Sequence, residues 1–226
     1  MSLPTMETLH QFPDAATIPV HRLADLGWRE RHEAYVGQTI RGGYRVAFIG
    51  DSITEGWEST GRQAWDAHFA PIPSANFGIG GDGTYNLLWR FANGEVRGYQ
   101  PDVFVLLIGT NNIGWGICDG QQTAAGIVAV VQALSDIAPV ARVLLHEILP
   151  RAEHPDDPMR TEVELANRLV REYGFGPNVS LMDNSHLFLR PDGTIPVELM
   201  PDFLHLTPEA YDMWAESLRP HILGAL

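Results

Sequence analysis

The sequence is poor in cysteine and in positive charge. Its 226 residues include one cysteine, Cys118, and 15 basic residues against 28 acidic ones, which gives a formal net charge of −13. A single cysteine excludes an internal disulfide framework and a cysteine-based zinc site. The acidic excess disfavours binding to nucleic acids or to anionic membranes, because like charges repel. We therefore expect no nucleic-acid partner.

Long apolar runs and targeting signals are also lacking. No stretch approaches the roughly 18 apolar residues of a membrane-spanning helix. The first 30 residues lack the basic segment and apolar run of a signal peptide. These absences predict a cytoplasmic protein with no membrane span; a leader removed before this sequence begins is the open alternative. Hydrophobic residues make up 45% and charged residues 19%, as in ordinary globular proteins.

Short apolar runs alternate with amphipathic segments along most of the chain. The runs suit strands buried on both faces of a parallel sheet, and they lie at 44–50, 72–77, 103–109, 142–148 and 178–182. Helices are predicted at 28–38, 62–69, 84–97, 121–138 and 160–173, with a last one capped by Thr207 and running to about 223. This alternation predicts an α/β fold with a five-stranded parallel sheet, which we expect in the order 2-1-3-4-5.

The length fits one large domain better than two. We expect that domain over residues 28–226. Residues 1–27 hold several prolines and show no clear period, so we expect them to be a loosely ordered N-terminal lead-in.

Polar residues follow the carboxyl ends of the predicted strands, where open parallel sheets bind their ligands. The first strand ends in Gly50-Asp51-Ser52, where glycine allows a sharp turn that exposes the serine hydroxyl. The second ends in an open glycine-rich loop at 76–81, and the third ends in Gly-Thr-Asn-Asn at 109–112. Near the C-terminus, an Asp-Phe-Leu-His segment at 202–205 directly precedes the last helix.

These four polar segments could together supply the nucleophile, the base and the oxyanion donors of acyl transfer. A serine hydroxyl becomes a good nucleophile when a base removes its proton, and His205 can take the proton of Ser52 and later return it to the leaving alkoxide. Asp202, three residues before the histidine, can fold back to fix the tautomer of the ring and stabilise the imidazolium. The backbone N–H groups of Ser52 and Gly81 and the amide of Asn111 are the candidate donors to an oxyanion.

The set Gly-Asp-Ser, Gly, Gly-x-Asn and Asp-x-x-His, in that order, resembles the SGNH (GDSL-type) hydrolase superfamily. Longer strings resemble the catalytic subunits of intracellular platelet-activating-factor acetylhydrolase and their bacterial relatives; they are VAFIGDSITEGW, NFGIGGDGTYNLLWRFANGE, GTNN, ILPR and DFLHLTPEAY. The similarity spans roughly 28–223.

The resemblance implies a flavodoxin-like three-layer α/β/α sandwich, hydrolysis of short acyl esters, and no metal or organic cofactor. By position it makes Ser52 the nucleophile, places Gly81 and Asn111 in the oxyanion hole, and completes a catalytic triad with Asp202 and His205. A homodimer is an option by resemblance alone.

The sequence departs from the wider superfamily at two positions. Asn112 stands where an aspartate is common, as in the acetylhydrolase branch, and Ile53 replaces the leucine of GDSL. Neither change removes a catalytic group, but Ile53 bears on the acyl-chain preference. Ile53, Thr110 and Leu204 adjoin the catalytic residues and are the candidate walls of an acyl pocket. Their branched bulk predicts a small acyl group such as acetyl.

Three functions are consistent with this set of residues. The first is an esterase or acetylhydrolase that cleaves a small-molecule ester through an acyl-enzyme intermediate. The second is a carbohydrate O-acetylesterase, which uses the same machinery on a different alcohol. The third is a catalytically idle fold used as an interaction surface, which we disfavour because all five catalytic positions are filled.

A rival motif points to another class of protein. Residues Gly78–Gly83 satisfy GxGxxG before a predicted helix, which is the pattern of a nucleotide-binding oxidoreductase. We disfavour this interpretation because the preceding strand is weak and is not the first of the fold. The acidic residue about 20 positions on, Asp102, begins the next strand at the wrong edge of the sheet.

Three further patterns have alternative interpretations. Asp183 and His186 form a second Asp-x-x-His, but the family resemblance selects Asp202 and His205, which directly precede the last helix. His146-Glu147 lacks the second histidine of the zinc motif HExxH, so we predict no metal site. Trp57 and Trp115 closely follow the candidate catalytic segments at 50–52 and 109–112. We expect both tryptophans in the core, with the mouth of the site as the alternative.

Overall fold

The computed structural model describes residues 5–226. At its centre lies a five-stranded sheet composed of β1 (Val46–Gly50), β2 (Ser74–Gly78), β3 (Val103–Leu107), β4 (Arg142–His146) and β5 (Val179–Met182). The strands lie in the order β2-β1-β3-β4-β5, and every neighbouring pair is parallel. The predicted fold class and strand order are therefore confirmed.

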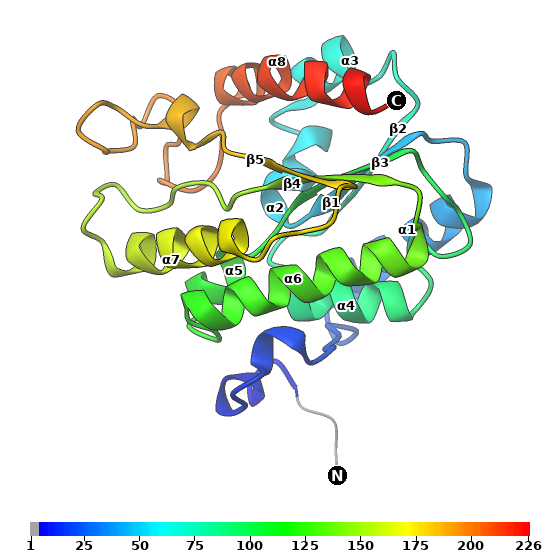
Figure 1. Cartoon of the computed structure of the whole chain (residues 1–226), viewed down its shortest axis with the longest axis horizontal. Coiled ribbons are helices and arrows are strands. Elements are labelled where there is room, and N and C mark those ends of the chain that lie inside the picture. Colours follow the sequence, from blue (N-terminus) through cyan, green and yellow to red (C-terminus); the bar gives the residue numbers. More distant parts are fainter. Residues whose placement is uncertain (1–4) are drawn as a thin grey trace.

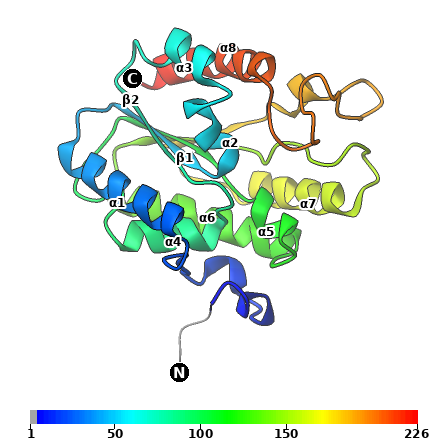
Figure 2. The same cartoon turned by 180° about the vertical axis from the view of Figure 1, so that it is seen from behind.

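Helices cover both faces of the sheet and make a three-layer sandwich (Figure 1, Figure 2). One face is covered by α1 (Leu26–Arg41), α4 (Thr84–Ala92), α6 (Gly120–Ile137) and α7 (Pro158–Glu172). The other is covered by α2 (Ser52–Glu55), α3 (Arg62–His68) and α8 (Pro208–Ala225). A single turn, α5 (Thr110–Gly114), follows β3.

The alternation of side chains along each strand divides the interior into two cores. On β1, Ala47 and Ile49 join the core beneath α1, α4, α6 and α7, whereas Val46 and Phe48 join the core beneath α3 and α8. Because every residue of β1 is buried, this strand has no polar face. The sheet is thereby fixed from both sides, and its carboxyl edge becomes a rigid platform for the loops.

Local caps explain where the long helices begin. Asp119 accepts a hydrogen bond from the backbone of Gln122, whose side chain bonds back to the Asp119 N–H, which makes a capping box at the start of α6. Asp157 and Thr207 cap α7 and α8, and a proline occupies the first helical position of each. The predicted start of the last helix at Thr207 is confirmed.

Two of the predicted strands differ from the observed ones in an informative way. β4 ends at His146, two residues before the apolar run does, because the Ile148 N–H bonds to the side chain of Asn167 rather than to a strand. β5 is an edge strand with Ser180 and Leu181 exposed, so it is not buried on both faces as predicted.

The segment before α1 packs against the start of α4. Its short 3-10 turns, Leu9–Gln11 and Ala15–Thr17, form a small apolar cluster with Tyr85 and Cys118. The Thr84 hydroxyl donates to the Ala16 carbonyl at 2.7 Å, which ties this segment to the helix. None of the helices in residues 5–226 combines the length and the apolar character that crossing a membrane requires.

Candidate active site

Ser52 stands at the carboxyl end of β1, at the first position of α2. The turn needs a glycine before it, because a side chain at Gly50 would collide with the Thr54 hydroxyl and the Leu107 carbonyl. Asp51 caps α2 by accepting a hydrogen bond from the Ile53 N–H at 3.0 Å. The strand and this cap together fix the serine at the rim of the sheet.

The structure brings Ser52 together with His205, which lies 153 residues further along the chain, and with Asp202. The Ser52 hydroxyl lies 2.9 Å from His205 Nε2, and His205 Nδ1 lies 2.6 Å from Asp202 Oδ2. The other oxygen of Asp202 accepts from the N–H groups of Leu204 and His205, at 3.1 and 2.7 Å. Between them Phe203 adopts a left-handed backbone (φ 57), and this tight turn folds the carboxylate back onto the ring.

The electrostatics of this chain of three residues select one tautomer. Partial burial acts to raise the pKa of Asp202, but the hydrogen bonds from the His205 ring and backbone outweigh it and hold that pKa below its usual range. A carboxylate can only accept hydrogen bonds, so Nδ1 of His205 must carry the proton. The lone pair of Nε2 is then free to accept the proton of Ser52.

Gly81 and Asn111 lie beside the serine, and both line one cavity with it. Gly81 has a positive φ of 79°, which favours glycine. Among residues 5–226 no backbone carbonyl accepts a hydrogen bond from the Gly81 N–H. Asn111 Nδ2 donates to the Asp82 carbonyl at 2.9 Å, and an amide nitrogen has a second hydrogen to offer. Both groups are therefore suitable donors to an anionic oxygen formed next to Ser52.

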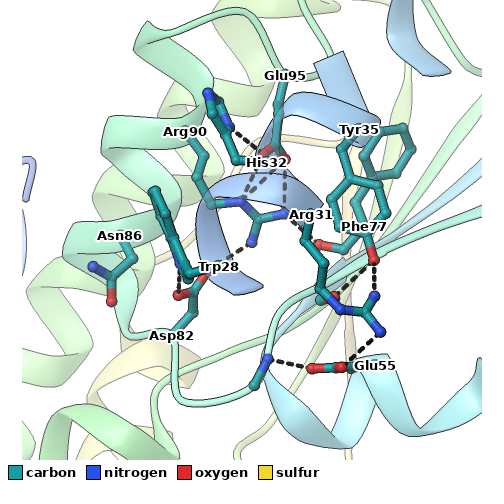
Figure 3. A network of polar contacts seen from close by, with 12 residues as sticks. Trp28, Arg31, His32, Tyr35, Glu55, Phe77, Asp82, Asn86, Arg90 and Glu95 are labelled. Carbon is teal, nitrogen blue, oxygen red and sulfur yellow. Dashed lines mark hydrogen bonds and ion pairs between the residues drawn. The ribbon is translucent and has the colours of Figure 1, made fainter. Parts of the chain in front are cut away.

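A buried charged network holds the loop that carries Gly81 (Figure 3). Asp82, the next residue, accepts from Trp28 Nε1 at 2.7 Å and from Arg90 at 2.8 Å. Arg90 also binds both oxygens of Glu95, which in turn contacts His32 at 2.6 Å. Asp82, Arg90 and Glu95 are fully buried, and a buried charge is tolerated only when it is paired in this way.

The same loop is held at its backbone. Tyr35 donates to the Gly78 carbonyl at 2.9 Å, and Arg22 donates to the Gly80 carbonyl at 2.7 Å. Glu55, on α2, accepts from the Gly80 N–H at 2.5 Å. Figure 3 shows two of these side chains, Tyr35 from α1 and Glu55 from α2, beside the buried network. The polar groups on either side of Gly81 are thus fixed before any ligand arrives, which is the condition for electrostatic preorganisation.

Asp51 is an acidic residue that is buried directly beside Ser52. One of its oxygens caps α2, and in the described chain the other has no hydrogen-bond partner. Burial raises the pKa of Asp51 to about 7; the Ile53 N–H opposes this shift and the charge of Asp82 adds to it. Asp51 therefore caps α2 directly beneath Ser52 and carries a raised pKa in the folded protein.

The cavity around Ser52 has a volume of about 370 Å³ and is lined by Ser52, Gly81, Asn111, Gly114, Trp115, Arg151, Leu204 and His205. Of the three residues proposed to wall an acyl pocket, Leu204 lines it and the other two do not. Ile53 is buried in the core beneath α3 and α8 because it follows Ser52 into α2. Thr110 is buried, and its hydroxyl is held by Arg151 at 3.1 Å.

Arg151 and Trp115 line the cavity; the sequence analysis did not identify Arg151, and it gave the mouth of the site only as the alternative for Trp115. Arg151 Nη1 also donates to the Thr110 carbonyl at 2.7 Å and lies against Gly114, which has no room for a side chain. Arg151 lies a few residues beyond the carboxyl end of β4, and the residues that follow β1, β2 and β3 also line the site. This position could have identified Arg151 from the sequence. Of the two tryptophans considered for the mouth, Trp57 is fully buried and Trp115 is 63% exposed.

The remaining candidates lie apart from Ser52. Asp183 caps a short turn by accepting from the Ser185 N–H, and His186 is exposed. His146 is buried against Trp214. Asp102 forms an ion pair with Arg45 at the opposite edge of the sheet. In residues 5–226 no cluster of three or more histidine, cysteine or acidic side chains has the arrangement of a metal site.

Comparisons with known proteins agree with this geometry. Residues 48–213 match the model of the GDSL-like lipase/acylhydrolase family. The alpha1 subunit of human platelet-activating factor acetylhydrolase IB is 35% identical over 216 residues, covering 95% of this chain and 91% of that protein. The alpha2 subunit from Gallus gallus is 36% identical over 200 residues, covering 88% and 85%.

Solved structures show the same fold at lower identity. A GDSL-like lipase from Bacteroides thetaiotaomicron superposes with a TM-score of 0.69 at 22% identity, covering 86% of this chain and 98% of that one. An acetylxylan esterase from Geobacillus stearothermophilus gives a TM-score of 0.63 at 20% identity, covering 80% and 94%.

Proposed function

We propose that this chain, which belongs to the GDSL-like lipase/acylhydrolase family and is a carboxylic ester hydrolase, removes short acyl groups through an acyl-enzyme on Ser52. The observation that carries the proposal is the hydrogen-bonded series from Ser52 to His205 to Asp202, at 2.9 and 2.6 Å. These distances are within the range in which a base can take a proton directly from a nucleophile.

Acylation begins when the ester carbonyl enters the cavity beside Ser52. Nε2 of His205 takes the hydroxyl proton as the oxygen attacks the carbonyl carbon, and Asp202 stabilises the imidazolium that forms. The N–H groups of Ser52 and Gly81 and the amide of Asn111 hold the oxyanion. When the tetrahedral intermediate collapses, the bond to the alcohol oxygen breaks, and His205 returns its proton to that oxygen.

Deacylation uses the same groups with water in place of the alcohol. His205 removes a proton from water, which attacks the carbonyl of the acyl-enzyme, and the Ser52 oxygen leaves with the proton that the histidine returns. The products are the carboxylic acid and the free serine. One water molecule is consumed per ester cleaved, and each proton that His205 takes is returned, so the reaction balances.

Acetyl is the acyl group that we favour. The relatives at 35% and 36% identity are acetylhydrolases by name. The cavity of about 370 Å³ lies at the lower end of the range for ligand pockets, which favours a small acyl group. Nitrophenyl acetate should therefore be cleaved with a higher kcat/KM than the butyryl to octanoyl esters, and faster turnover of the longer esters would contradict this preference.

The proposed function is tested by nitrophenyl acetate hydrolysis with the wild type and Ser52→Ala. Ser135→Ala is the matched control, because Ser135 lies on α6 and its hydroxyl donates to the Val131 carbonyl within that helix. We expect Ser52→Ala to lose turnover and Ser135→Ala to keep it. Equal rates for the wild type and Ser52→Ala would remove Ser52 from the mechanism.

A carbohydrate O-acetylesterase is the second candidate, since it differs only in the alcohol that leaves. One observation favours it, which is the exposed indole of Trp115 at the mouth of the cavity.

A further inference from the structure

Two loops extend from the sheet toward the same side of the molecule (Figure 1). The first, at 147–157, joins β4 to α7, and the second, at 183–207, joins β5 to α8. The N–H of Ala152 in the first loop donates to the carbonyl of Phe203 in the second, at 3.0 Å. This hydrogen bond therefore joins the loop after β4 to the turn that carries His205.

Both residues of this contact have an unusual backbone conformation. Ala152 has a φ of 64° and Phe203 a φ of 57°, in the left-handed region that residues other than glycine rarely adopt. Such a conformation persists where the surrounding structure imposes it. Asp202 and His205, on either side of Phe203, are exposed, so burial does not fix them. The geometry of this turn depends instead on the contacts that hold its backbone.

Arg160 binds both loops from the first turn of α7. Its side chain is buried, and it donates to the carbonyls of Arg151 and Ala152 at 2.8 and 2.6 Å. It also donates to the carbonyl of Gly193, in the loop after β5, at 3.2 Å. The Arg151 carbonyl and the Ala152 N–H belong to one planar peptide unit. By holding that carbonyl, Arg160 sets the direction in which the N–H points toward Phe203.

The three hydrogen bonds of Arg160 all go to neutral carbonyls. Burial lowers the pKa of Arg160, and the charges of Glu164 and Asp157 oppose this shift without reversing it. Neutral carbonyls satisfy the N–H groups but do not neutralise the charge as a carboxylate would. The planar guanidinium spans three carbonyls from two loops, whereas the ammonium of a lysine is a compact donor group. The shape of arginine, more than its charge, therefore suits this position.

We propose that Arg160 is a positioning residue that keeps the carboxylate of Asp202 against the ring of His205. It acts through the peptide unit that ends at Ala152 and through Phe203, which lies between the two site residues. The inference rests on the proposed function and adds to it a residue outside the lining of the substrate cavity. Arg160 itself transfers no proton and touches no substrate.

The experiment measures kcat and KM for nitrophenyl acetate, together with thermal stability, in the wild type, Arg160→Met and Arg160→Lys. Methionine fills a similar space without any donor, and lysine keeps the charge without the fork. Asn167→Ala is the matched control, because Asn167 is also buried on α7 and bonds to the backbone N–H and carbonyl of Ile148, in the same loop. All three variants leave buried backbone groups without partners, so all should lose thermal stability.

We expect Arg160→Met to lower kcat by about 10- to 100-fold with little change in KM, because a small displacement of the base costs rate rather than binding. Arg160→Lys should lose less, since the ammonium can still reach part of the carbonyl set. Asn167→Ala should keep kcat near that of the wild type although its thermal stability falls.

A double-mutant cycle with Asp202→Asn separates positioning from a structural effect. Once the carboxylate is gone, its placement no longer matters, so Arg160→Met should lower kcat by at most about threefold in that background. A second cycle uses Asn111→Ala, which changes a residue on α5 rather than in the turn. In that background Arg160→Met should cost its full factor.

Four results would overturn the inference. Wild-type kcat in the folded Arg160 variants would remove the role outright. The same fold-loss with and without Asp202, or an equal loss of kcat in Asn167→Ala, would mean that α7 and its loop are merely loosened. Coupling to Asn111 instead of Asp202 would mean that Arg160 acts on the oxyanion side, through Arg151.

The Arg160→Lys variant carries both cycles if Arg160→Met does not fold, with the same pattern expected at a smaller size. Failure of this inference remains distinct from failure of the proposed function. Nitrophenyl acetate turnover that survives Ser52→Ala would overturn the function whatever the Arg160 variants do. Loss of turnover in Ser52→Ala with additive Arg160 cycles would leave the esterase intact and remove only the positioning role.

Discussion

The hydroxyl of Ser52 depends on its neighbours for its reactivity. Asp202 lies two hydrogen bonds from it, and we infer that this carboxylate sets the tautomer that leaves Nε2 of His205 free to accept a proton. Although the carboxylate does not touch Ser52, its chemistry decides whether the serine can attack.

Replacing Asp202 by asparagine tests this dependence. An amide can donate to Nδ1 and hold the wrong tautomer, so we expect kcat for nitrophenyl acetate to fall by about 10³- to 10⁴-fold with little change in thermal stability. Asp183→Asn is the matched control, because it alters the other Asp-x-x-His of the chain, whose carboxylate caps a turn. If both variants kept wild-type kcat, Asp202 would have no part in activating the serine.

Replacing Asn111 tests the proposed donor to the oxyanion. Removing its amide in Asn111→Ala should lower kcat by about 10²- to 10³-fold with a nearly unchanged KM, because the donor acts on charge that develops in the transition state. Asn178→Ala is the control, since Asn178 Nδ2 also donates to a carbonyl, that of Pro139, far from the site. A rise in KM without a loss of kcat would assign Asn111 to substrate binding instead.

Helix α1 supports the loop that carries Gly81. Trp28 and Tyr35, both on this helix, donate to Asp82 and to the Gly78 carbonyl. Arg90 on α4 completes the support from the other side. The loop is therefore held by two helices packed on one face of the sheet, and the position of Gly81 depends on how they pack.

A pair of conservative variants tests this role of α1. Trp28→Phe removes the hydrogen bond to Asp82, whereas Trp214→Phe removes an equally buried indole whose N–H has no partner in the described chain. The two variants lose similar volume, so their thermal stabilities should fall alike. We expect only Trp28→Phe to lower kcat, by about tenfold for the loss of a bond to a charged group, with KM unchanged. Equal kcat values would mean that the network affects folding alone.

Prediction from the sequence succeeded for the five strands and for the helices of about two turns or more, and it failed for the helices of a single turn. The five strands and the capped helices could be predicted because apolar periodicity and N-cap residues such as Thr207 are local signals. The short helices α2 and α5 were missed, since each is about one turn long and begins at a polar site residue. The ion pairs of Arg90 join residues that no linear motif connects, and Ile53 was misplaced because the direction of its side chain depends on the helix that follows Ser52.

Folding of the whole molecule buries the carboxyl group of Asp51 next to Ser52. Burial raises the pKa of Asp51 to about 7, well above that of an aspartate in an unfolded chain, about 3.9. Between these two values the folded state binds more protons than the unfolded state, so the free energy of unfolding falls as the pH rises from about 4 to about 7. Asp82, whose pKa burial raises to about 6 against the opposing charge of Arg90, acts in the same direction.

Asp51→Asn isolates this contribution, because asparagine keeps the oxygen that caps α2 but does not titrate. Urea unfolding at pH 5, 6, 7 and 8 should show a shallower fall of stability for the variant, the difference amounting to at most about 1.4 kcal/mol per pH unit. Asp66→Asn, which alters an exposed aspartate paired with Arg62, should run parallel to the wild type. Parallel curves for Asp51→Asn as well would show that Asp51 is already ionised at pH 5.

We propose that the fold makes Ser52 nucleophilic by joining it to His205 and Asp202 at the rim of the sheet. Mass spectrometry after treatment with a fluorophosphonate, which phosphonylates activated serines, tests it most directly. We predict a single adduct on the peptide that contains Ser52, formed at a rate that falls sharply in His205→Ala. An adduct on another serine, or equal labelling of Ser52 without the histidine, would contradict the account.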